Sequence, residues 1–157
     1  MVPEECLEWT PEQSAHNWKR NFSETGQLKE GEYIYVAENS EDGVVGFAML
    51  EEIRPTDTAS LPIDKKYSHE LVVLQVAPNW QRQGVGRLLV SHVATKAKEL
   101  GATHLLVRVL IENPNKVFYK RLGAVQLATQ PYDWDGYKTT ELIYGWENIM
   151  QLANGYG

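Results

Sequence analysis

The sequence lacks the features that would make it a secreted, membrane or nucleic-acid-binding protein. Its 157 residues include one cysteine, Cys6, so an internal disulfide is excluded and a reducing compartment is favoured. No stretch approaches the roughly 20 apolar residues of a membrane-spanning helix. The first residues, MVPEECLEW, lack the apolar core of a secretory signal. A net charge of −6 argues against a nucleic-acid binder. We therefore expect a cytoplasmic protein without nucleic-acid or membrane partners.

The charge is unevenly distributed along the chain. Residues 1–70 carry 15 Asp and Glu against 6 Lys and Arg, whereas residues 71–157 carry 6 against 9. One interpretation is that this reflects only solvated faces. The other is that the second half handles an anion while the first half attracts a cationic partner. Composition alone leaves both open.

Apolar periodicity and turn residues predict one α+β domain over residues 1–157. The expected elements, in chain order, are a helix over 10–22, a hairpin of strands 32–39 and 44–53, a loop over 54–66, a strand over 69–78, a helix over 84–100, a strand over 103–111, a short helix over 113–124, and strands 124–130 and 136–146 separated by PYDWDG. Residues 1–9 are expected to form a short lead or an abbreviated first strand, and residues 147–157 a tail.

The segment NWQRQGVGRLLV, residues 79–90, lies where a buried strand passes into a helix. The first turn of a helix has backbone N–H groups without helical partners and carries partial positive charge, so it attracts anions. Glycine adopts backbone angles closed to other residues, and arginine adds charge-assisted hydrogen bonds. The segment is either a plain glycine turn or a phosphate cradle. It is not a P-loop, which requires G-K-[ST], nor a dinucleotide fingerprint, since Leu89 replaces the third glycine.

The combination of motifs resembles the GNAT family of N-acetyltransferases. That family's acetyl-CoA motif, Q/R-x-x-G-x-G/A, is matched by Gln81, Gly84 and Gly86, with a strand ending in Val-x-Pro before it and FYKRLGA after it. The resemblance covers residues 30–146 in element order and 70–124 at motif level. It implies a GNAT-like acyl-CoA N-acyltransferase fold, with a central mixed, mostly antiparallel sheet flanked by helices.

The resemblance also implies roles for individual residues. The pantetheine arm of acetyl-CoA is expected along the backbone of Leu74, Gln75 and Val76, beside a strand that diverges from its neighbour. Asn113, or alternatively Asn115, matches the asparagine that contacts the cofactor. The pyrophosphate is expected on the backbone amides of the loop and first helical turn, which belong to Arg82, Gln83, Gly84, Val85, Gly86 and Arg87. No metal is expected.

The chemistry of acetyl transfer calls for a base, an oxyanion donor and an acid. By the resemblance, Tyr119 is the acid that protonates the departing thiolate, although a packing aromatic is the alternative. The Val76 N–H is the natural oxyanion donor. Glu70 is the leading candidate for the base, acting through water, with His69 and Glu112 as weaker candidates.

The sequence therefore predicts an acetyl-CoA-dependent N-acetyltransferase that moves an acetyl group to a primary amine by direct attack on the thioester. The acceptor is expected to be a small cationic amine or an amine of a peptide or protein. The alternative is a non-catalytic CoA-binding sensor or interaction module of the same fold. The carboxy-terminal strands are compatible with a homodimer.

Overall fold

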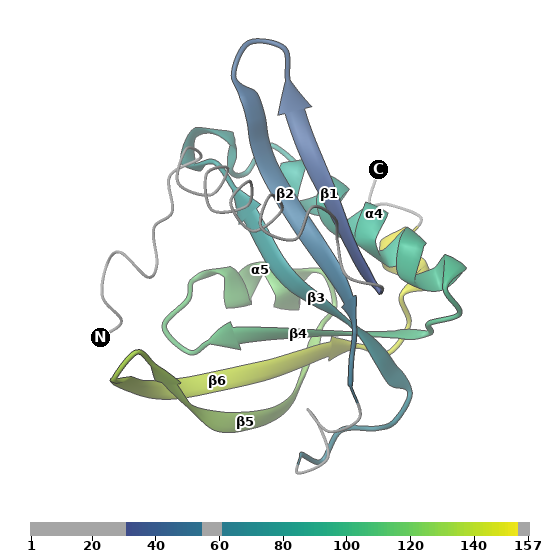
Figure 1. Cartoon of the computed structure of the whole chain (residues 1–157), viewed down its shortest axis with the longest axis vertical. Helices are drawn as coiled ribbons and strands as arrows, with labels where there is room; N and C mark the ends of the chain where they lie inside the picture. Colours follow the sequence, from purple (N-terminus) through teal and green to yellow (C-terminus); the bar gives the residue numbers. More distant parts are fainter. Residues whose placement is uncertain (1–30, 55–60, 154–157) are drawn as a thin grey trace.

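The computed structural model describes residues 31–54 and 61–153, and its strands form one twisted sheet (Figure 1). The strand order is β1-β2-β3-β4-β6-β5. The strand bounds are Glu32–Asn39 for β1, Gly43–Glu52 for β2, Tyr67–Val76 for β3, His104–Leu110 for β4, Val125–Trp134 for β5 and Tyr137–Trp146 for β6. Among these strands only β3 and β4 pair in parallel. The expected mixed, mostly antiparallel sheet is confirmed.

Both antiparallel hairpins follow from local turn chemistry. Between β1 and β2, the Asn39 Oδ1 accepts hydrogen bonds from the N–H groups of Glu41 and Asp42 at 2.9 and 3.3 Å. Between β5 and β6, Asp135 and Gly136 form the turn with φ values of 48° and 93°. Such a two-residue turn with positive φ matches the twist of the paired strands. The prediction that all of PYDWDG is a turn was wrong, because β5 continues to Trp134.

The parallel pair requires a crossover, which α4 (Val85–Glu99) supplies after a short 3₁₀ helix, η1 (Pro78–Trp80). The apolar side of α4 packs on the sheet. Its Gly84 cap lies at one end, and Lys96 and Lys98 lie near the negative end of the helix dipole. Helix α5 (Asn115–Arg121) follows β4 on the same face of the sheet. It is shorter than the 113–124 predicted.

Residues 147–157, expected as a tail, include the short helix α6 (Met150–Ala153). Ile149 and Leu152 are buried against α4. The Ser91 hydroxyl in α4 donates to the Ala153 carbonyl at 3.3 Å. The Thr95 hydroxyl donates to the Ser91 carbonyl at 2.8 Å and lies 3.3 Å from the same Ala153 oxygen. This docking closes one end of the core. The predicted helix over 10–22 and the lead over 1–9 lie outside the described residues.

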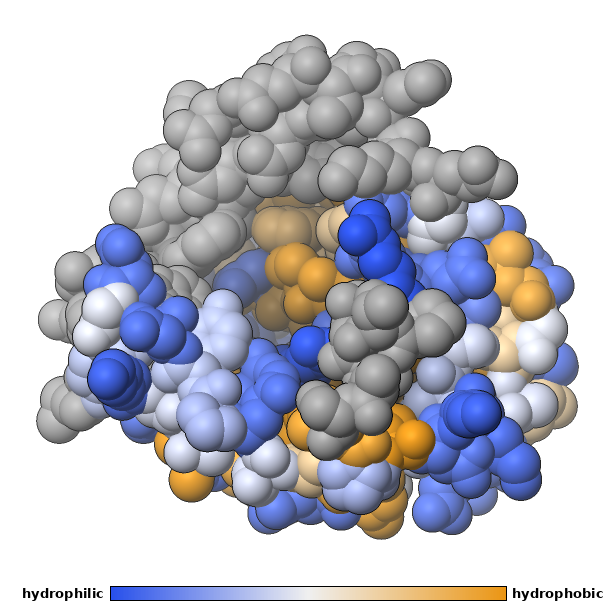
Figure 2. Space-filling view, turned by 60° about the horizontal axis from the view of Figure 1, so that its bottom comes forward, coloured by the Kyte–Doolittle hydropathy of each residue, from blue (hydrophilic) through white to orange (hydrophobic). Residues whose placement is uncertain are grey.

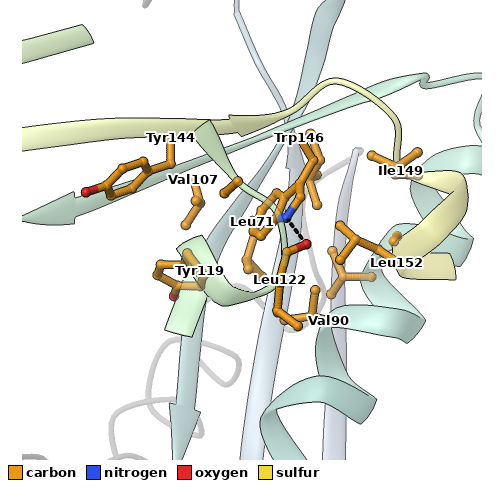
Figure 3. Packing of buried hydrophobic residues seen from close by; sticks show 14 of the residues in the cluster. Leu71, Val90, Val107, Tyr119, Leu122, Tyr144, Trp146, Ile149 and Leu152 are labelled. Atoms are coloured by element: carbon orange, nitrogen blue, oxygen red, sulfur yellow. Dashed lines mark hydrogen bonds between the residues drawn. The ribbon is translucent and has the colours of Figure 1, made fainter. Parts of the chain in front are cut away.

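The main core lies between the sheet and the three helices α4, α5 and α6 (Figure 3). Alternate residues of the central strands enter it, including Leu71, Val107 and Tyr144. The opposite face of the sheet has a smaller cluster of Tyr67, Leu106 and Ile143. Because strand side chains alternate between faces, polar residues next to these three also project on that opposite face.

No helix of the described chain is long and apolar enough to cross a membrane. Figure 2 shows hydrophobic surface in the middle of one face, with hydrophilic described residues on both sides of it.

Candidate active site

The central feature of the site is a wedge between β3 and β4. The two strands pair only from Tyr67 to Leu71, and the last pair is Leu71 with Val107. Beyond it β3 stays paired with β2 as far as Val76, whereas β4 stays paired with β6 (Figure 1). A bulge marks the divergence, because Met49 pairs with Val73 and Leu50 with Leu71, which leaves Val72 as an extra residue in β3. An extra residue bends a strand and increases its local twist.

The bulged strand turns alternate backbone groups towards the wedge. Ala77 N–H donates to Val45 of β2 at 2.8 Å, and a β-carbon added to Gly46 of β2 would lie 2.9 Å from the Gln75 carbonyl oxygen. The backbone groups of residues 75 and 77 therefore face β2, and alternation turns those of Leu74 and Val76 to the wedge side. Among the three residues expected beside pantetheine, Gln75 thus directs its backbone away from the wedge.

The loop after β3 is held in a strained conformation at the mouth of the wedge. Arg82 has a φ of 63° and Gly84 a φ of 87°, both in the left-handed region. Such a conformation is uncommon for arginine, and backbone strain of this kind concentrates at functional sites. Gln81 Nε2 donates to the Val76 carbonyl at 3.2 Å, which ties the loop to the end of β3. The conformation of the loop is therefore held by a specific hydrogen bond and by an unusual backbone angle at Arg82, which a plain turn does not require.

Helix α4 directs its first amides towards this loop. The first helical hydrogen bond runs from Leu88 N–H to the Gly84 carbonyl at 3.0 Å. The amides of Val85 and Gly86 precede that bond, so they point out of the helix end, where the dipole carries partial positive charge. Arg82 and Arg87 flank the same turn and are exposed. This arrangement suits a phosphate group.

The two glycines of the motif have different physical roles. A β-carbon on Gly84 would meet nothing within 4 Å, so this glycine is required by its positive φ. Gly86 has no positive φ, but a β-carbon there would lie 3.2 Å from Cζ of Phe118. Gly86 therefore lets the Phe118 ring of α5 approach the start of α4. The contact brings together segments 32 positions apart, and only the fold reveals it.

Tyr119 follows Phe118 and is 5% exposed. Its ring meets those of Phe118 and Trp146 edge to face, with centroids 5.6 and 6.0 Å apart. Trp146 Nε1 donates to the Leu122 carbonyl at 3.1 Å and so anchors the end of α5 to β6 (Figure 3). Burial raises the pKa of the Tyr119 hydroxyl well above its ordinary value, so the group stays protonated at neutral pH. Both expected roles of Tyr119, acid and packing aromatic, fit this environment.

The candidates for the base are separated by the sheet. Glu70 pairs with Leu106 and projects with it on the face away from the helices. His69 projects on the other face and is 8% exposed, and its Nδ1 lies 2.8 Å from the Ser68 hydroxyl. Burial lowers the pKa of His69, and the carboxylate of Glu52 partly opposes this. Glu112, two residues beyond the end of β4, accepts from the Thr139 hydroxyl with both oxygens, at 2.6 and 2.7 Å.

Comparison with known proteins decides the family. A family model described as an acetyltransferase (GNAT) domain matches residues 30–123, more than half of the chain. The chain belongs to the GNAT acetyltransferase family. It therefore has the fold and the acetyl-CoA-dependent N-acetyltransferase activity class of that family.

Individual relatives of this acetyltransferase are distant. YuaI of Bacillus subtilis (strain 168), described as an uncharacterized N-acetyltransferase, is 25% identical over 133 residues, covering 85% of this chain and 73% of YuaI. A structure assigned to the GNAT family from Desulfovibrio desulfuricans has a TM-score of 0.66 and 22% identity, covering 90% of this chain and 83% of that one. An acetyltransferase of Bacillus subtilis in complex with CoA has a TM-score of 0.56 and 20% identity, covering 81% and 82%.

Within this acetyltransferase, Asn113 is engaged locally. Its Oδ1 accepts from the Asn115 N–H at 2.8 Å and forms the turn that opens α5. Its side-chain amide nitrogen can still donate to a cofactor, and the role of Asn113 stays a prediction, as does that of Asn115. Two residues near the site had not been predicted, Phe118 and Arg108. Phe118 could have been found from the sequence, since it lies in the FYKRLGA motif. Arg108 could have been found as a charged residue within the apolar segment THLLVRVLI, where charges are unusual.

Proposed function

We propose that this acetyltransferase binds acetyl-CoA along the wedge, with the pyrophosphate on the amides at the start of α4. The observation that carries this proposal is the end of β3–β4 pairing at Leu71 and Val107, next to a helix start framed by Arg82 and Gly84. Leu74 and Val76 offer backbone groups to an extended amide-containing arm, in the manner of an added strand. The CoA complex of the Bacillus subtilis structural relative supports the same ligand here.

The chain's own groups can then serve each step of acetyl transfer. Acetyl-CoA supplies the acetyl group as an activated thioester. The Val76 N–H donates a hydrogen bond to the carbonyl oxygen, and Glu70 accepts a proton from the acceptor amine through water. The Tyr119 hydroxyl, kept protonated by burial, holds the proton that the departing sulfur receives. The amine attacks the thioester directly, so no acyl-enzyme is required.

The acceptor is proposed to be a cationic primary amine, either a small molecule or an amine of a peptide or protein. The carboxylates of Glu70, Glu112 and Glu141 belong to the face of the sheet away from the helices, opposite the proposed cofactor loop. Negative charge on that face favours the approach of an ammonium group. A panel of spermidine, kanamycin, lysine and an alanine-terminated peptide, with mass spectrometry of the products, tests this class.

Substitution of the proposed acid tests the mechanism. We expect Tyr119→Phe to reduce turnover at least tenfold, as loss of a general acid does, with less than a twofold change in CoA affinity. Free thiol release measures turnover, and calorimetry measures binding. Tyr33→Phe is a matched control, because it removes a hydroxyl from a tyrosine of the edge strand β1, outside the wedge. Unchanged turnover in Tyr119→Phe would show that another group protonates the sulfur.

The same assays distinguish the proposed enzyme from the alternative, a CoA-binding module without turnover. Saturable CoA binding with no thiol release on any amine of the panel would favour the module, whereas absent binding would overturn both. A cytoplasmic location and a homodimer are further parts of the proposal. Cell fractionation and light scattering of the purified protein test them.

A further inference from the structure

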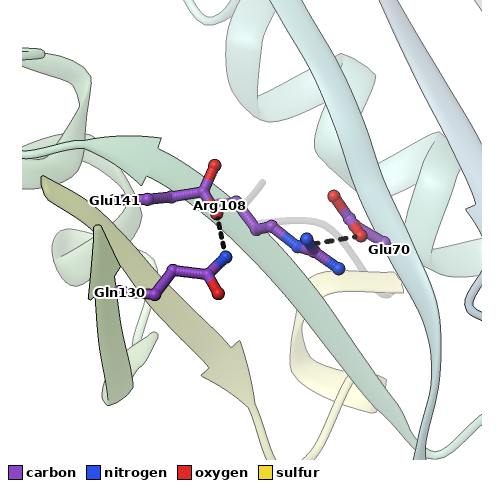
Figure 4. A network of polar contacts seen from close by, with 4 residues as sticks. All are labelled: Glu70, Arg108, Gln130 and Glu141. Atoms are coloured by element: carbon purple, nitrogen blue, oxygen red, sulfur yellow. Dashed lines mark hydrogen bonds and ion pairs between the residues drawn. The ribbon is translucent and has the colours of Figure 1, made fainter. Parts of the chain in front are cut away.

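Two opposite charges flank the apex of the wedge, one on each of the diverging strands. Glu70 immediately precedes Leu71 in β3, and Arg108 immediately follows Val107 in β4, where Leu71 and Val107 are the last pair. Both side chains project on the face away from the helices. Arg108 Nε lies 3.4 Å from Glu70 Oε1 (Figure 4). The ion pair therefore spans the point at which the strands separate.

This ion pair is shielded from solvent. The side chain of Glu70 is 15% exposed and that of Arg108 is 22% exposed. The Arg108 Nε atom is buried and makes no hydrogen bond to a described residue, so its contact with Glu70 is one of charge. Charges taken out of water interact more strongly than surface pairs, and loss of one partner leaves the other uncompensated. Removal of Arg108 is therefore expected to change the protonation of the Glu70 carboxyl more than removal of a surface arginine would.

Three carboxylates of the described strands and their ends lie on the same face as Glu70. On β2, Glu51 pairs directly with Glu70, and like charges directly opposite one another repel. On β6, Glu141 lies diagonally from Arg108 and accepts from Gln130 Nε2 at 2.6 Å (Figure 4). Glu112, beyond the end of β4, is bonded to Thr139. Arg108, from β4, brings a positive charge to this group of carboxylates.

We propose that Arg108 is a positioning residue for acetyl transfer. It holds Glu70 ionised against Glu51 and fixes its carboxylate at the apex of the wedge, where that carboxylate can accept the proton of the incoming amine. This inference rests on the proposed function, in which Glu70 is the base. Arg108 acts through Glu70 and does not itself touch the reacting atoms.

Two measurements test this role. The first is the pH dependence of kcat/KM for the panel amine with the highest turnover, and the second is the ¹³C titration of the Glu70 carboxyl by NMR in the full chain. In Arg108→Met we expect both midpoints on the acid side to rise by about one pH unit or more. Activity should then fall about tenfold below the wild-type midpoint and recover at high pH. CoA affinity should change less than twofold. Arg108→Lys, which keeps the charge, should largely restore the midpoint.

The controls separate this inference from the proposed function. Arg121→Met removes an exposed arginine from α5 and should leave both midpoints unchanged. If Arg108→Met does not fold, Arg108→Gln carries the same test. An unshifted Glu70 titration, or an activity loss equal at every pH, overturns the role of Arg108. Wild-type activity in Glu70→Gln would instead overturn Glu70 as the base, and the NMR titration would still report on the ion pair.

Discussion

Replacement of Gly86 by alanine tests whether the contact between α4 and α5 sets the geometry of the site. The new β-carbon would lie 3.2 Å from Cζ of Phe118 and 3.6 and 3.8 Å from the two neighbouring ring carbons. Carbon atoms in contact prefer about 3.5–4.0 Å. The ring must therefore move by a few tenths of an ångström, and Tyr119 follows it in the chain.

Two opposing terms determine the stability of Gly86→Ala. Overpacking of a core contact costs about 1–3 kcal/mol, and the small displacement points to the lower end. Alanine in place of glycine inside a helix recovers about 1 kcal/mol. The free energy of unfolding should then change by less than about 1 kcal/mol. Turnover is more sensitive to position, so we expect it to fall about three- to tenfold.

A double-mutant cycle with Phe118→Leu isolates the contact. Leucine removes the ring that the new methyl group meets, so Gly86→Ala should be better tolerated in that background, with a coupling energy of about 1 kcal/mol. Urea unfolding measures stability, and thiol release measures turnover. If the cycle gives a coupling below about 0.3 kcal/mol, within the scatter of independent sites, the packing role assigned to Gly86 is refuted.

Three other perturbations have outcomes that follow from the geometry. Gly84→Ala should lower the free energy of unfolding by about 1–2 kcal/mol through backbone strain alone, because the site is open; urea unfolding measures it. Trp146→Phe removes the hydrogen bond from Trp146 Nε1 to the Leu122 carbonyl and should cost about 0.5–1.5 kcal/mol in the same assay, whereas an unchanged midpoint would argue against the anchor. The folded-state pKa of His69 lies below its unfolded value of 6.5, so its contribution is present above pH 6.5 and is lost as the pH falls through the folded value. His69→Gln should therefore flatten the decline in stability between pH 7 and pH 5, and an equally steep decline would refute this.

Much of the fold could be predicted from local patterns. The hairpins, the β3–α4–β4 crossover and α5 follow from apolar periodicity and from glycines at turns, which depend on neighbours a few residues away. The errors lie at boundaries, as where β5 continues to Trp134, because pairing with β6 overrides a turn-prone composition. The helix α6 is too short to show a periodic signal, and its docking on α4 stabilises it.

The sequence by itself determined the motif, and with it the family and the acyl carrier. Strand, loop and helix are consecutive there, so the spacing of Gln81, Gly84 and Gly86 already specifies a local conformation that suits a phosphate. Tertiary structure alone decided which residues face the wedge. The parallel register of β3 and β4 places Glu70 beside Arg108, 38 positions later in the chain. Such contacts depend on register, and a shift of one residue would turn every side chain of a strand to the other face.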